Sequence, residues 1–158
     1  MTVTEPSDDL LNTIIGAAPS SALATLRAQR AEIQRHTQGS HDVLLYPADP
    51  GGLSLAERAS VAHRVAGLSG HAALTAHYQT LVAAHGEPPA DARRDAILAH
   101  AERLAEAPGS ATRAHLTALG AVGLQARDIV ALAQLVAFVA YQVRAAVGLS
   151  LLAQEKAA

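Results

Sequence analysis

The sequence predicts one all-α domain of six or seven helices that covers residues 1–158. Half of the residues are hydrophobic but only 3% are aromatic, so the interior must be built from alanine, leucine, valine and isoleucine, which suits closely packed helices. Helix start and stop signals recur along the chain. A chain of this length can bury a core of its own without metal or disulfide bonds. We expect residues 1–6 and 153–158 to be loosely held.

Two helices are predicted in the N-terminal third. A short helix over residues 10–15 carries leucine and isoleucine and is closed by glycine and proline. The serine pair at 20–21 can cap a second helix, which fades near residues 36–39. Two prolines and two adjacent glycines then interrupt the chain, so residues 39–53 are predicted to form a long loop.

The central third carries the sharpest start signal. Ser54 and Glu57 match a capping box, in which each side chain satisfies a free amide at a helix N-terminus, and a helix over 54–68 follows. Ser69 is the predicted N-cap of a next helix that continues until Gly86. The two helices are expected to pack as a hairpin.

The C-terminal third predicts a helix over 91–107, ended by Pro108, and a further segment opened by Ser110. The most apolar stretch, residues 129–147, comes last. Its uncharged part, residues 129–143, falls short of the roughly 20 residues needed to cross a bilayer. We therefore predict a buried core or interface helix and no membrane partner.

Composition and charge exclude several classes of function. The chain has no cysteine, which removes disulfides, thiolate metal ligands and thiol nucleophiles together. Its net charge of -2, with no run of basic residues, lacks the electrostatic footprint of a nucleic-acid binder. The first ten residues do not read as a secretory signal. We expect a cytoplasmic protein without a nucleic-acid partner.

Two segments resemble a known superfamily. They are LSLAERASVAHRVAGLSG, residues 53–70, and LTALGAVGLQARDIVALAQLVAFVAYQVRAAVGLSL, residues 116–151. Both resemble the carboxymuconolactone decarboxylase and alkylhydroperoxidase D-like (AhpD-like) superfamily, in particular its peroxidase-related members. A weaker likeness is the N-terminal region that longer members carry. The resemblance implies an all-helical domain and a homo-oligomer, since such proteins are commonly trimers or hexamers of paired subunits.

The residues that the superfamily's thiol peroxidases use are replaced in this chain. They use a Glu, a Cys-x-x-Cys pair and a His, and an ungapped match puts these roles on Ala59, His71, Leu74 and Tyr78. The neighbouring His77 is one residue out of register, which on a helix rotates a side chain by about 100°. With no thiol, peroxide reduction through a disulfide is excluded.

The remaining candidates for a site are His71, Tyr78 and His63. In the first turn of a helix capped by Ser69, His71 would meet the positive end of the helix dipole, which favours a neutral ring able to act as a general base. Tyr78 would lie on the same face, and His63 would approach from the preceding helix. Each also has a structural interpretation. His71 can be a polar residue in place of a cysteine, Tyr78 a core aromatic residue, and His63 a residue on the flank of its helix.

No cofactor or metal site is predicted. The eight histidines show no pair at i and i+4 on a helix, and His36 and His41 fall in or near a predicted loop, so they are interpreted as chance surface residues. Two functions stay open. One is an acid–base enzyme acting on a small organic ligand, and the other is a catalytically silent structural or regulatory partner of a cysteine-containing relative.

Overall fold

The computed structural model describes residues 9–18 and 21–155, and within them every regular element is helical. This confirms the predicted all-α fold. The described residues form eight α-helices and one 3₁₀ turn, against the six or seven helices predicted. The elements are α1 Leu10–Ile14, α2 Ala22–Ala28, α3 Ala31–Leu45, α4 Leu55–Leu68, α5 Ala72–His85, α6 Ala92–Glu106, η1 Pro108–Ser110, α7 Arg113–Ala121 and α8 Ala126–Glu155.

The N-terminal part differs most from the prediction. The predicted second helix is two helices, because the backbone leaves the helical conformation at Arg30. The helix α3 then continues through Gly39 to Leu45, so the loop covers residues 46–54 rather than 39–53. Buried His41 and Leu45 stabilise this extension, since packing contributes more to a helix than intrinsic propensity does.

The predicted loose ends are tested only in part. Residues 1–6 and 156–158 lie outside the described residues, whereas residues 153–155 belong to α8 and are helical.

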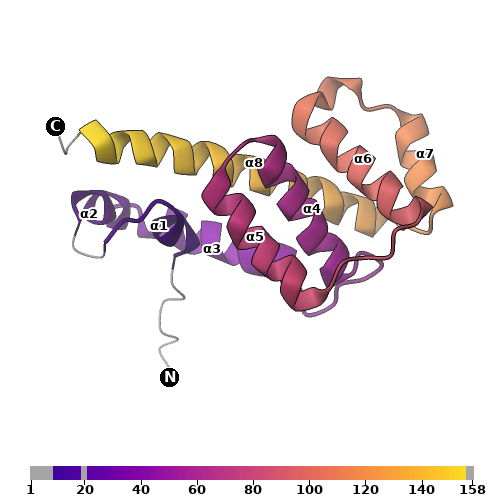
Figure 1. The fold of residues 1–158 in the computed structure, drawn as a ribbon, viewed down its shortest axis with the longest axis horizontal. Coiled ribbons are helices and arrows are strands. Elements are labelled where there is room, and N and C mark those ends of the chain that lie inside the picture. The colour runs from indigo at the N-terminus through magenta and orange to yellow at the C-terminus, as the bar shows by residue number, and fades with distance from the viewer. Residues whose placement is uncertain (1–8, 19–20, 156–158) are drawn as a thin grey trace.

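The hairpin of α4 and α5 lies at the centre of the molecule (Figure 1). The capping box of Ser54 and Glu57 is confirmed, with both reciprocal hydrogen bonds present. The predicted N-cap at Ser69 is wrong, because Ser69 is the C-cap of α4 and donates its amide to the Val65 carbonyl. Gly70 follows with φ of 68°, a conformation that favours glycine, and the turn moves the start of α5 to His71.

The long helix α8 runs the length of the molecule and holds it together (Figure 1). It packs on α3, α4 and α6, and Leu132, Leu135 and Val139 in its first half are fully buried. Its last part passes α1 and α2. The expectation that this apolar stretch is too short to cross a bilayer is wrong, because Ala126–Ala153 is long and apolar enough by length and composition, a criterion that core helices of soluble proteins meet as well.

Candidate functional site

His71 is the N-cap of α5, not a residue of its first turn as predicted. Its Nδ1 atom accepts a hydrogen bond from the Leu74 amide over 3.3 Å, which satisfies one of the free amides at the start of the helix. The Thr75 hydroxyl donates to the His71 carbonyl over 3.0 Å. The half-buried ring therefore has a structural task at the beginning of α5.

Tyr78 lies in the core, with 0% of its surface exposed. Its hydroxyl donates a hydrogen bond to the side-chain carbonyl of Gln142 on α8, which is 1% exposed. Burial raises the pKa of Tyr78 far above its ordinary value. The tyrosine thus joins α5 to α8 and keeps its proton at neutral pH.

The structure does not bring the three predicted site residues into mutual hydrogen-bonding contact. His63 is half-buried on α4, and no hydrogen bond among the described residues links it to His71 or Tyr78. The other two positions matched to the thiol peroxidases, Ala59 and Leu74, are 1% and 0% exposed. All four matched positions are therefore occupied by a helix cap or by core side chains.

Sequence reasoning missed a cluster of aromatic rings between α3, α5 and α8. The His41 and His77 ring centroids are 5.7 Å apart, and His77 also meets Tyr78 edge-on at 5.1 Å. The rings of Tyr46 and Phe138 also lie near His41, with centroids 6.1 Å and 6.5 Å from it. The sequence did not predict this cluster because His41 was expected in or near a loop, whereas the structure buries it on α3.

The two histidines of this cluster each bury a nitrogen that lacks a protein partner. The Nε2 atoms of His41 and His77 are sealed from solvent and make no hydrogen bond among the described residues. The His41 Nδ1 atom lies 3.0 Å from the Asp42 carboxylate. Burial, with a smaller effect of His41, lowers the pKa of His77. The surroundings of His77 therefore favour its neutral ring.

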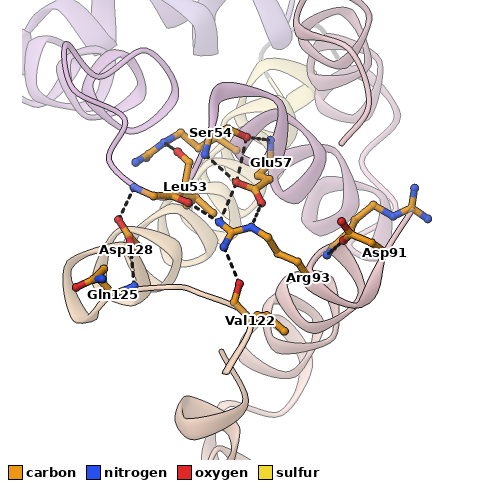
Figure 2. Close-up of polar contacts among 11 residues, drawn as sticks. Leu53, Ser54, Glu57, Asp91, Arg93, Val122, Gln125 and Asp128 are labelled. Atoms are coloured by element: carbon orange, nitrogen blue, oxygen red, sulfur yellow. Dashed lines mark hydrogen bonds and ion pairs between the residues drawn. The ribbon is translucent and has the colours of Figure 1, made fainter. Parts of the chain in front are cut away.

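A buried ion pair fixes the start of α4 to α6 (Figure 2). The Glu57 carboxylate accepts from Arg93 Nε over 2.6 Å and from the Ser54 amide over 2.8 Å. Burial alone would raise the pKa of Glu57, but these hydrogen bonds outweigh it and hold the pKa below its ordinary value. Arg93 also donates to the Val122 carbonyl before α8. Sequence reasoning found the cap and missed the arginine, which is 36 residues away.

A second buried carboxylate fixes the loop before α4. Asp128 is 2% exposed and accepts from the backbone amides of Gly52 and Gln125, each over 2.8 Å (Figure 2). Although burial acts to raise it, the pKa of Asp128 is lowered by these amides and by Arg127. A Cβ atom at Gly52 would collide with this carboxylate, so the close approach requires glycine. Both carboxylates are thus engaged in holding the fold.

Among the described residues, no group of three or more histidine, aspartate or glutamate side chains is arranged to hold a metal ion. A cavity of about 410 Å³ opens instead between α2, α3 and α8, and a second of about 310 Å³ adjoins it. Neither cavity is lined by His71, Tyr78 or His63 in the described part of the chain.

The fold has a counterpart among solved structures. The chain is similar to an uncharacterized peroxidase-related protein from Silicibacter sp. TM1040, with a TM-score of 0.61 and 20% sequence identity over 92% of this chain and 85% of that one. This chain has a peroxidase-related fold. No family model and no curated protein match the chain. The likeness supports the predicted fold, while membership of the superfamily stays a prediction.

Proposed function

We propose that the chain is a catalytically silent protein on a peroxidase-related fold, acting as a structural or regulatory partner of a cysteine-containing relative. One observation carries the proposal. The positions that match a thiol site are committed to the fold, since His71 caps a helix, Leu74 is in the core and Tyr78 bonds Gln142. The absence of cysteine removes the thiol chemistry itself.

A homo-oligomer is part of this proposal. The last part of α8 leaves Val147, Leu151 and Leu152 exposed, at 47%, 58% and 45% of their surfaces. Adjacent exposed side chains of this size favour contact with another subunit. The mass of the purified protein in solution tests this part, and a monomer at micromolar concentration would contradict it.

An acid–base enzyme is the second candidate. It is supported by the half-buried His71 ring, whose Nε2 atom has no hydrogen-bond partner among the described residues. Tyr78 does not support it, because its hydroxyl is buried and already bonded. A base needs to reach the proton that it abstracts, so this candidate depends on Nε2 alone.

Replacing His71 separates the two candidates. Under the silent proposal, His71→Ala loses about 1 kcal/mol of unfolding free energy because the cap is gone, and His71→Asn, which restores a cap, recovers it. Neither the wild type nor either variant turns over a panel of lactones and small keto acids. Turnover by the wild type that both variants lose, with His71→Asn folded normally, would refute the silent proposal.

Partnership is tested by co-expression with a cysteine-containing peroxidase-related protein. The proposal predicts a mixed oligomer of defined mass and a change in the peroxide reduction rate of that relative. Separate homo-oligomers and an unchanged rate would contradict it. The folded but cap-deficient His71→Ala protein serves as control and should still enter the mixed oligomer.

A further inference from the structure

An apolar groove follows the last part of α8 on the side of α2 and α3. Its larger cavity, of about 410 Å³, lies within the range of roughly 300–1,000 Å³ typical of small-ligand sites. Leu26, Ile33 and Leu149 supply apolar walls. The adjoining cavity of about 310 Å³ shares Ile33 and Tyr141 with it, so the two form one elongated groove between α3 and α8.

The charged side chains that line the larger cavity in the described chain are all positive. Three arginines line the larger cavity, and no aspartate or glutamate of the described chain does. Arg27 is neutralised by Asp9 at 2.9 Å. Arg30 and Arg144 are exposed, and neither has an ion-pair partner among residues 9–18 and 21–153. As far as the described side chains go, two guanidinium groups at an apolar groove are available to an anion.

We propose that this groove binds a single-chain carboxylate amphiphile, with its carboxylate on Arg30 and Arg144 and its alkyl chain along Ile33 toward Tyr141. The groove shape suits an extended chain, and the unbalanced positive charge selects an anionic head. The inference goes beyond the proposed function, because the groove contains no residue of α4 or α5 and needs no catalysis.

A second copy of the chain is the competing occupant. A two-fold symmetric contact uses the same patch on both subunits, so it would bring the arginines of one copy toward the equally positive patch of the other. Like charges brought together across an interface oppose association. The charge pattern therefore favours an anionic ligand over a symmetric subunit contact at this place.

Calorimetric titration of the purified full chain with decanoate, methyl decanoate and octanoate tests the proposal. Decanoate is expected to bind about one molecule per chain. Methyl decanoate, which lacks the charge, should bind about tenfold more weakly. Octanoate, shorter by two methylenes, should bind about 15-fold more weakly, because burying one methylene changes affinity about fourfold.

Two sets of variants locate the site. Arg30→Gln and Arg144→Gln should each weaken decanoate binding about tenfold and leave methyl decanoate within about twofold, whereas the exposed Arg113→Gln on α7 should change neither. Gly148 lines the larger cavity and a Cβ atom there meets nothing within 4 Å, so Gly148→Leu is expected to occupy part of the cavity. It should abolish binding, while Gly120→Leu, equally open on α7, should not.

Several results would overturn the proposal. Equal binding of decanoate and its methyl ester would show that the arginines do not select the head group. Unchanged decanoate binding by a folded Gly148→Leu protein would place the ligand elsewhere. If the wild type does not bind decanoate and Gly148→Leu instead changes the oligomeric mass, a second copy occupies the groove.

Discussion

Tyr78 and Gln142 show how single residues keep polar atoms inside a hydrocarbon core. The tyrosine is fully buried and the glutamine nearly so, and each satisfies the other across the contact between α5 and α8. A buried polar group costs free energy unless it is paired, so replacing either residue alone should destabilise the fold. At this scale the position matched to a catalytic histidine has become part of the packing.

Removing one member of this pair should cost more than removing both. Tyr78→Phe leaves the Gln142 amide buried without a partner and is expected to lower the free energy of unfolding by about 1–3 kcal/mol. The double variant Tyr78→Phe with Gln142→Leu should recover much of that loss, because the core is then apolar throughout. Urea denaturation of the wild type, the two single variants and the double variant measures the coupling free energy between the two side chains. Strictly additive losses would contradict the pairing.

At the scale of elements, two Arg–Glu pairs join α4 to α6 in different surroundings. In the inner pair, Arg93 and Glu57 have side chains 28% and 9% exposed, whereas in the outer pair, Arg64 and Glu102 are 52% and 33% exposed. A carboxylate left buried is far more costly than one left in water. The inner pair should therefore contribute most to holding the two helices.

Matched replacements test that difference. Arg93→Met is expected to lower the free energy of unfolding by about 2–3 kcal/mol, because it strands the Glu57 carboxylate. Arg64→Met removes the exposed pair and should cost at most about 1 kcal/mol. Chemical denaturation of both variants measures the two losses. Similar losses would mean that burial does not set the strength of these pairs.

The helices from α4 onward were predictable because their ends carry local signals, such as the capping box of Ser54 and Glu57. The extension of α3 to Leu45 was not, because it depends on packing against α8 and overrides a glycine. The cap at His71 was missed by two residues, since the sequence does not reveal that Gly70 would take a left-handed conformation. The partners Arg93 and Gln142 lie too far along the chain for any local pattern to find.

Across the whole molecule, buried histidines should make stability depend on pH. Burial is the main cause that lowers the pKa of both His77 and His100 in the folded protein. Below about pH 6.5 the unfolded chain then binds more protons than the folded one, so stability falls as pH decreases. The lowered pKa values of Glu57 and Asp128 reduce stability only nearer pH 4, where carboxylates of the unfolded chain begin to bind protons.

Measuring the free energy of unfolding from about pH 8 to pH 5 tests this dependence. The wild type should be stable and pH-independent at the upper end and lose stability below about pH 6.5. His77→Phe keeps a ring in the cluster without a titrating group and should flatten the lower part of the curve. His36→Gln, which replaces an exposed ring on α3 outside the cluster, is the control for the loss of a histidine. If the curve of His77→Phe falls as steeply as that of the wild type, His77 is not a source of the pH dependence.

The position of the proton on the His71 ring tests the central claim that His71 serves the fold as a helix cap. Long-range proton–nitrogen NMR of the histidine rings at about pH 8, with His71→Asn to assign the signal, reports which nitrogen carries it. A cap whose Nδ1 accepts from Leu74 predicts a bare Nδ1 and the proton on Nε2. A proton on Nδ1 would contradict the cap and return His71 to the candidates for chemistry.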